Sequence, residues 1–261
     1  MMTLSAAEIT AWVGAFMWPF LRVGAMVFVA PIFGNTQIPM RIRLMLTIAL
    51  TVAIMPAVGS VPPVDALTLE ALVIAMQQVV VGLAMGLLLA MAFQTVVIAG
   101  EAVALTMGLG FASMIDPQSG QSVPVVSQFL QVVITLLFLL VGGHLMLIEM
   151  TAASFQSLPV GIEGLERSRI ALMLAWATQM YAGAVLVALP AIIMLLMVNM
   201  ALGVMTRAAP QMNIFSVGFP LTMLVGFILI MTLVIPSLPN RMSGIWSSAF
   251  NTMGRMLGLP G

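Results

Sequence analysis

The sequence alternates long apolar runs with short polar connectors. Several of the runs contain no charged residue over the roughly 20 positions that a helix needs to span a bilayer. They are also too continuously apolar for the strands of a membrane barrel, in which polar and apolar positions alternate. The pattern therefore predicts about six long apolar helices, over residues 9–33, 44–60, 71–106, 125–148, 170–205 and 217–238.

The connectors between these helices are too short to fold as domains of their own. They cover residues 34–43, 61–70, 107–124, 149–169 and 206–216, and a tail follows from Pro239. Pro190 interrupts the longest apolar run, which is compatible either with two short spans or with one kinked helix. We expect a single helical assembly over residues 1–261.

Composition places this assembly in a membrane. Hydrophobic residues make up 62% of the chain and charged residues 6%, whereas a soluble domain carries roughly 25% charged residues. With so few charges, the surface of a soluble fold would itself be apolar. The eight basic residues are all arginines and form no dense basic face of the kind that binds nucleic acid. Cysteine is absent, which excludes disulfides and thiolate metal sites. We therefore expect an all-α, multi-pass membrane protein.

Isolated polar residues within the apolar runs are candidates for function, because placing them in hydrocarbon is costly. Arg22 and Glu101 both lie in such runs. Glu101 is compatible with an ion or proton pathway, but no second acid lies near it to form a relay, which favours a charge at an interface. His144 is the only histidine, too few ligands for a metal site, and we expect it to be hydrogen-bonded near a helix end. We expect no enzymatic activity, no cofactor and no metal.

Small residues recur at helical spacing in two places. Gly82 and Gly86 form a GxxxG pair, and Gly100 and Ala104 begin a row that repeats every four residues. Small residues at this spacing let helix backbones approach closely, which is the main route to helix association in lipid. We expect these positions to pack against other helices, including helices of other chains.

The connector over residues 107–129 has an unusual composition, MGLGFASMIDPQSGQSVPVVSQF. It combines glycines with the apolar Phe111 and Met114, followed by the turn-forming pair Asp116 and Pro117. An ordinary surface loop would be more polar. The segment fits either a closure of a water-filled passage, where irregular backbone is tolerated at membrane depth, or a re-entrant turn packed for structure alone.

Three segments together resemble one known family. They are PIFGNTQIPMRIR (31–43), the GFASMIDPQSG loop (110–120) and TRAAPQMNIFSVGFPLTMLVGF (206–227). The chain resembles the FliR family over essentially its whole length, that is, the R subunits of the flagellar type III export gate and their virulence-secretion relatives. The wording SMIDPQSG is more similar to the flagellar members.

The resemblance implies a non-catalytic subunit in the bacterial inner membrane, at the flagellar basal body. It implies partners of the P and Q types, which together form the gate through which unfolded export substrates leave the cytoplasm. It also implies a fold in which a P-like helical unit over residues 1–205 precedes the end of a Q-like hairpin and a tail over residues 206–261.

The resemblance further implies two sets of functional residues. Those of the loop over residues 107–121, which would close the pore or act as its hinges, are Gly108, Gly110, Phe111, Ala112, Ser113, Met114 and Gly120. Those at the turn of the Q-like hairpin, which would fix the turn and contact other subunits, are Pro210, Gln211, Asn213 and Phe215.

Other functional classes remain open beside this one. A virulence-secretion gate subunit would share the family pattern, and a purely structural assembly subunit would share the small-residue rows. A small-solute secondary transporter needs a polar site at broken helices. Gln77, Gln78 and Pro190 fit such a site, but no cluster of ion-coupling residues accompanies them.

Overall fold

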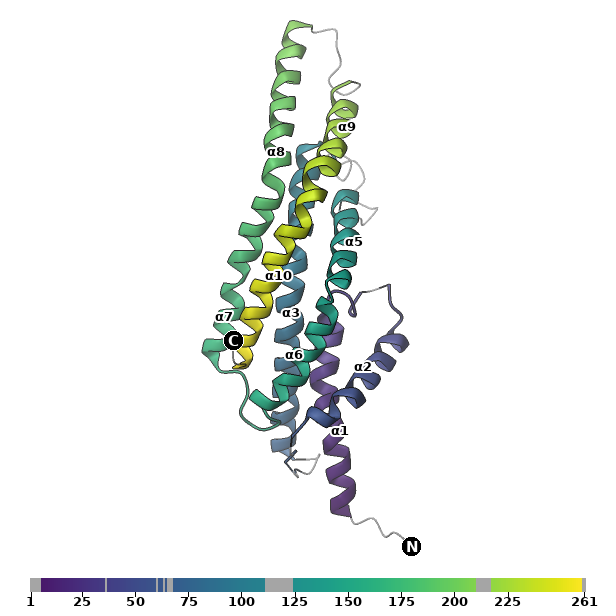
Figure 1. Ribbon diagram of the computed structural model, residues 1–261, viewed down its shortest axis with the longest axis vertical. Coiled ribbons are helices and arrows are strands. Elements are labelled where there is room, and N and C mark those ends of the chain that lie inside the picture. The colour runs from purple at the N-terminus through teal and green to yellow at the C-terminus, as the bar shows by residue number, and fades with distance from the viewer. Residues whose placement is uncertain are drawn as a thin grey trace. The chain divides into compact units, whose positions relative to one another are not determined.

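The computed structural model describes residues 6–35, 37–59, 61, 62, 64, 68–110, 124–209 and 217–259, with side chains described from residue 14 onward. All regular structure in these ranges is helical (Figure 1). The helices are α1 (Ala6–Val29), α2 (Met40–Ile54), α3 (Leu69–Thr106), α5 (Val125–Leu140), α6 (Gly143–Ser157), α7 (Arg167–Ala175), α8 (Ala177–Ala208), α9 (Phe219–Leu229) and α10 (Ile235–Leu257).

Within the described ranges, four helical segments are long and apolar enough to cross a membrane, namely Met40–Ala57, Leu69–Thr106, Arg167–Ala208 and Phe219–Leu257. The pair α5 and α6 makes a fifth candidate if it is taken as one span, and α1 carries a shorter apolar stretch, Gly14–Val29. These segments confirm the prediction of an all-helical, multi-pass membrane protein.

Two helix boundaries differ from the sequence-based prediction. The helix expected over residues 125–148 breaks after Leu140 and resumes from Gly143 to Ser157, because Gly142 adopts a left-handed conformation with φ +77°. The last helix does not end near residue 238. A π-helical turn, Ile230–Val234, leads into α10, which tolerates Pro236 and Pro239 near its start and continues to Leu257. The expected tail from Pro239 is therefore helix.

The sequence left two possibilities for the longest apolar run. Pro190 lies inside α8, a single helix of 32 residues, so the run does not divide into two short spans at this proline. Within the same run, Trp176 separates α7 from α8. Among the described residues, the chain divides into two compact units, and the division falls within α3, α5 and α10 and at the start of α8. Unit 1 comprises residues 1–91, 138–177 and 247–261, and unit 2 comprises residues 92–137 and 178–246.

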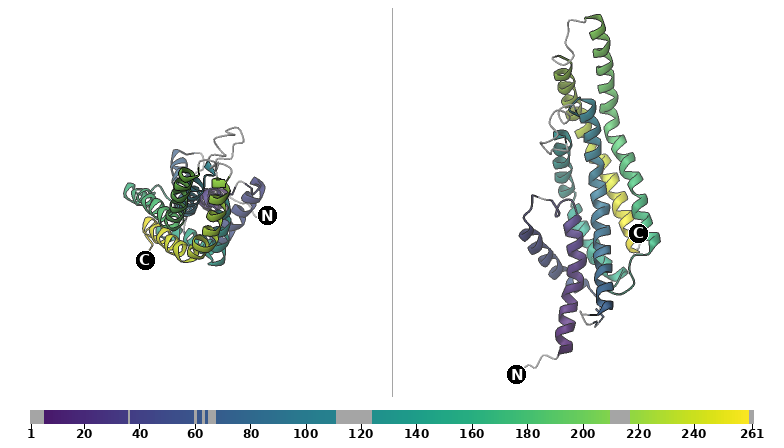
Figure 2. Two further views of the ribbon diagram at one scale, coloured as in Figure 1. Left: turned by 90° about the horizontal axis from the view of Figure 1, so that it is seen from above. Right: turned by 180° about the vertical axis from the view of Figure 1, so that it is seen from behind.

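Close helix packing through glycine defines the core of unit 1. The start of α3 lies beside α1 (Figure 2), and a Cβ atom added at Gly82 would collide with the carbonyl oxygen of Arg22. A Cβ atom at Gly86 would come within 2.9 Å of the Cβ of Val29 and 3.1 Å of the carbonyl oxygen of Met26. Both glycines therefore face α1, at a backbone separation that a larger residue would not permit.

Unit 2 repeats this type of contact between the end of α3 and α5. A Cβ atom at Gly100 would lie 2.8 Å from both the Cα and the Oγ of Ser127. The Ser127 hydroxyl donates to the carbonyl oxygen of Val97 at 3.1 Å, a bond that the missing Cβ allows. Ala104, one turn further along α3, is fully buried.

Candidate functional site

The end of α3 is capped by its own backbone. Leu109 N–H donates to the carbonyl oxygen of Ala104 at 3.0 Å, and Gly108 N–H donates to that of Leu105 at 3.1 Å. Gly108 has φ +87°, and this combination of bonds and left-handed glycine is the Schellman ending of a helix. A side chain at Gly108 would be strained in this conformation and would collide with the ring of Phe219.

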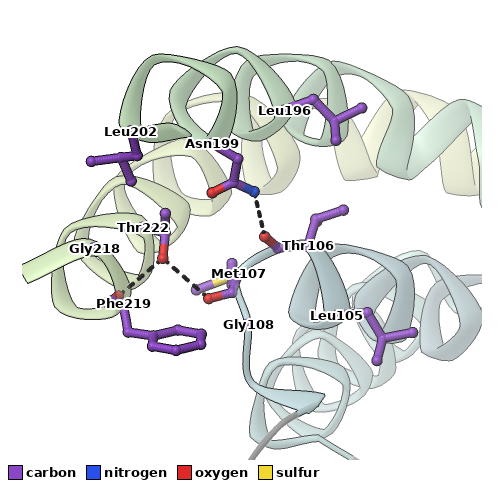
Figure 3. Close-up of a pocket in the computed structure, with 10 residues that line it drawn as sticks. All are labelled: Leu105, Thr106, Met107, Gly108, Leu196, Asn199, Leu202, Gly218, Phe219 and Thr222. Atoms are coloured by element: carbon purple, nitrogen blue, oxygen red, sulfur yellow. Dashed lines mark hydrogen bonds between the residues drawn. The ribbon is translucent and has the colours of Figure 1, made fainter. Parts of the chain in front are cut away.

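Two side chains from other helices of unit 2 complete this cap (Figure 3). Asn199 of α8 donates from Nδ2 to the carbonyl oxygen of Thr106 at 3.1 Å. The hydroxyl of Thr222 on α9 lies 3.3 Å from the carbonyl oxygen of Met107, and also 3.0 Å from that of Phe219. These bonds satisfy carbonyl groups that a helix end leaves without partners. We call these four residues, Thr106, Met107, Asn199 and Thr222, the α3 anchor.

Steric contacts also hold the α3 anchor in place. Met107 is fully buried, and a Cβ atom added at Gly226 of α9 would come within 2.6 Å of its Cε and Sδ atoms. A cavity of ≈ 430 Å³ remains beside the anchor, bordered by Leu105, Leu196, Leu202 and Gly218 together with the anchor residues (Figure 3). The last turn of α3 therefore has fixed neighbours in both α8 and α9.

The loop and turn residues expected from the family resemblance are only partly described. Gly108 and Gly110 lie at the end of α3, beside the α3 anchor. The remaining expected loop residues, Phe111, Ala112, Ser113, Met114 and Gly120, lie outside the described residues, as do the expected turn residues Pro210, Gln211, Asn213 and Phe215. Gly82, Gly86, Gly100 and Ala104 lie in α3, as given above.

A second polar group, the Arg22 cluster, lies in unit 1 and comprises Arg22, Gln78, Ser154, Phe155 and Leu158. Arg22 Nε donates to the amide oxygen of Gln78 at 2.9 Å. Its Nη1 donates to the carbonyl oxygen and hydroxyl of Ser154 at 2.9 and 3.0 Å, and its Nη2 donates to the carbonyl oxygen of Leu158 at 2.8 Å. The guanidinium also lies over the ring of Phe155, 4.1 Å from its centroid.

The charge of Arg22 is compensated by a helix end rather than by a carboxylate. Ser154 and Leu158 lie at the C-terminal end of α6, where carbonyl groups carry the negative end of the helix dipole. Arg22 is 1% exposed, and among the described residues its hydrogen-bond acceptors are all uncharged. The cluster therefore fixes α1 to α3 and α6 without an ion pair.

The sequence singled out Arg22 because a charged side chain in hydrocarbon is costly, but it did not predict which groups Arg22 bonds to. It also did not predict a role for Asn199 or Thr222. The available signal was the same in each case, a polar residue isolated within an apolar helix. His144 lies in the first turn of α6, near a helix end as expected, but its buried Nδ1 atom has no hydrogen-bond partner among the described residues. The half-buried Glu101 lies within α3, five residues before Thr106 of the anchor. No group of three potential metal ligands occurs among the described side chains.

These features define a class of protein, a helical multi-pass membrane protein whose helices pack through glycine and through hydrogen bonds to helix ends. The sequence matches the family described as bacterial export proteins, family 1, over residues 13–249. The chain belongs to this family.

Curated relatives match the chain over nearly its full length. The flagellar biosynthetic protein FliR of Escherichia coli (strain K12) is 35% identical over 257 residues, which cover 98% of each chain. That of Pectobacterium carotovorum subsp. carotovorum is 34% identical over 258 residues, again 98% of each chain. That of Bacillus subtilis (strain 168) is 29% identical and covers 95% of this chain and 96% of the relative.

Proposed function

We propose that the chain is a non-catalytic gate subunit of the flagellar protein export apparatus in the bacterial inner membrane. Its near full-length similarity to flagellar FliR proteins supports the flagellar assignment over the virulence one. In this proposal it assembles with P-type and Q-type subunits, residues 1–205 forming the P-like part and residues 206–261 the end of the Q-like part. Unfolded export substrates pass through the assembled gate.

The loop over residues 107–121 closes the gate at rest in this proposal. A closure made of glycines and small or apolar side chains, Gly110 to Met114, excludes ions by contact and dewetting and still yields to a polypeptide. The observation that carries the proposal is the α3 anchor. A loop that moves repeatedly and returns to one place needs a base that does not move, and two helices hold the base of this loop through its backbone carbonyls.

Deletion of residues 110–114 tests the closure directly. The deletion is expected to raise the leakage of small solutes through the assembled gate, measured by dye or ion release from vesicles that contain the purified complex. Wild-type leakage from a deletion variant that still assembles would rule out the closing role. Leakage at wild-type level combined with lost motility would indicate a purely structural subunit.

Substitutions in the α3 anchor test the role of the base. Thr222→Val removes the hydrogen bond to Met107 and is expected to cost about 1 kcal/mol, and the loosened base should raise leakage without abolishing assembly. Thr232→Val is the matched control, because the Thr232 hydroxyl bonds only to the carbonyl oxygen of Ile228 in its own helical segment. Equal leakage from the two variants would contradict the role of the anchor.

Co-purification separates the gate from a small-solute transporter. A gate subunit should be recovered with P-type and Q-type subunits, whereas a transporter should be stable alone or as a homo-oligomer. Gln78 is one of the glutamines that fit a transporter site. Its amide oxygen accepts a hydrogen bond from Arg22 Nε and Gln78 is 1% exposed, so this oxygen is already occupied inside unit 1.

A further inference from the structure

Unit 1 contains an open groove between α6 and α10 whose lining is partly charged. The groove has a volume of ≈ 670 Å³, within the range of about 300–1,000 Å³ that small-molecule sites occupy. Its polar side chains are Glu149 and Gln156 on α6 and Asn251 and Arg255 on α10. We call this cavity the α6–α10 groove.

The two charges of the groove have opposite signs, and neither is paired within the described part of the chain. Glu149 and Arg255 are both exposed, and no described residue forms an ion pair or hydrogen bond with either side chain. Two other arginines of the unit are held internally: Arg43 donates to the carbonyl oxygens of Asn35 and Ile38, and Arg169 donates to that of Met256. Glu149 and Arg255 thus remain available to a ligand that carries both a cation and an anion.

The rest of the groove is apolar, and the space beside Gly254 is open. The side chains of Met146 and Met150 contribute flexible thioethers, which adapt to irregular apolar ligands. A Cβ atom added at Gly254 would meet only the Cε of Met150, at 3.7 Å, so packing within the chain does not require a glycine there. The apolar part therefore has space for an alkyl chain beside the charged part.

We propose that the α6–α10 groove binds a zwitterionic phospholipid with a primary ammonium headgroup, the phosphatidylethanolamine class. The ammonium group donates hydrogen bonds to Glu149, the phosphate accepts from Arg255 and from the amides of Gln156 and Asn251, and an acyl chain lies along Met146 and Met150. Charge complementarity favours this lipid because its headgroup carries both an ammonium group for Glu149 and a phosphate group for Arg255. A helix of a partner protein would need two separate side chains of opposite charge at matching positions, and a helix is longer than this groove.

Native mass spectrometry of the purified complex from nanodiscs tests the proposal. The nanodiscs contain equimolar phosphatidylethanolamine, phosphatidylcholine and phosphatidylglycerol, and the lipids retained on the complex are counted by class. Wild type is expected to retain phosphatidylethanolamine over phosphatidylcholine by about fivefold, the effect of one weak charge-assisted contact. Glu149→Gln should abolish this preference, because phosphatidylcholine differs only in lacking ammonium N–H donors. Arg255→Gln should lower the retention of all three classes.

Matched controls are Glu163→Gln and Arg167→Gln, which change exposed charges of the same unit that do not line the groove. Both should retain lipids as wild type does. Equal retention of the lipid classes by wild type, or an unchanged preference in Glu149→Gln, would overturn the proposal. A photo-crosslinking residue at Met150 gives an independent readout: cross-links to lipid support the proposal, and cross-links to another protein in place of lipid overturn it. These outcomes do not depend on leakage, so they are separate from the test of the closing loop.

Discussion

Replacement of Arg22 provides a sharp test of how unit 1 is held together. Arg22→Leu leaves two acceptors without the hydrogen bond that Arg22 donates to them, namely Gln78 Oε1 and the carbonyl oxygen of Leu158. The carbonyl oxygen of Ser154 still accepts the Leu158 N–H at 2.9 Å, so it keeps a partner. One newly unsatisfied buried acceptor, Gln78 Oε1, costs about 1–3 kcal/mol, and the part-buried carbonyl oxygen of Leu158 costs less. The lost stacking on Phe155 adds to this. The expected destabilisation is about 2–4 kcal/mol.

Arg22→Lys separates the role of geometry from that of charge. A lysine keeps the positive charge near the end of α6, but its single ammonium cannot reproduce the planar fork that bonds Gln78, Ser154 and Leu158 together. We expect it to recover less than half of the lost stability. Arg41→Gln is the control, because Arg41 is exposed and should change the stability by no more than about 0.5 kcal/mol.

The assay is the thermal stability of the detergent-solubilised complex, together with the steady-state abundance of the chain in membranes. Arg22→Leu should lower both, Arg22→Lys should fall between it and wild type, and Arg41→Gln should match wild type. If Arg22→Leu were as stable as wild type, helix-end compensation of this charge would contribute nothing, and the reasoning would be refuted.

Three further predictions concern helix packing and helix ends. Gly82→Ala places a methyl group against the backbone of α1 and should destabilise the complex by about 2 kcal/mol or more, whereas Gly203→Ala, with open space around it, should be neutral or stabilising by up to about 1 kcal/mol; equal melting shifts would contradict the packing argument. Ser127→Ala removes the buried bond to Val97 and should lower thermal stability by about 1 kcal/mol; a shift no larger than the measurement error would show that the bond contributes nothing. Arg169→Gln removes the donor at the end of α10 and should speed hydrogen exchange of the last helical turn, whereas Arg167→Gln should not; the same exchange rate in both would exclude this role for Arg169.

Long apolar runs and charge-free gaps were enough to predict most helices, because hydrocarbon excludes almost every other backbone arrangement. The failures came from single residues whose effect depends on local geometry. Gly142 lies in an apolar stretch that has the composition of one helix, yet its left-handed conformation divides that stretch. Pro239 has the composition of a helix stop, yet it lies inside α10, in a helical segment that continues from α9 through the π-helical turn.

The candidate sites were less predictable than the helices. Two of the four acceptors of Arg22 are backbone carbonyls 132 and 136 residues further along the chain, and a carbonyl group leaves no trace in sequence composition. Asn199 is likewise defined by what it caps, the end of a helix 93 residues earlier. Gly108 could be selected from the sequence, because its neighbours predict a turn, but its contact with Phe219 depends on tertiary packing.

The position of the Arg22 acceptors constrains the order of biosynthesis. When α1 leaves the ribosome, the guanidinium group of Arg22 has none of its backbone acceptors. The carbonyl groups of Ser154 and Leu158 are synthesised 132 and 136 residues later, which is more than half of the chain length. We therefore expect the first helix to reach its final position only after these carbonyl groups are in place. The chain has no cysteine, so a single cysteine at Gly14 can report the position of α1 through its labelling by a membrane-impermeant thiol reagent. Labelling should differ between a released chain that ends at residue 150 and one that ends at residue 166, and equal labelling of the two would show that the first helix reaches its position independently.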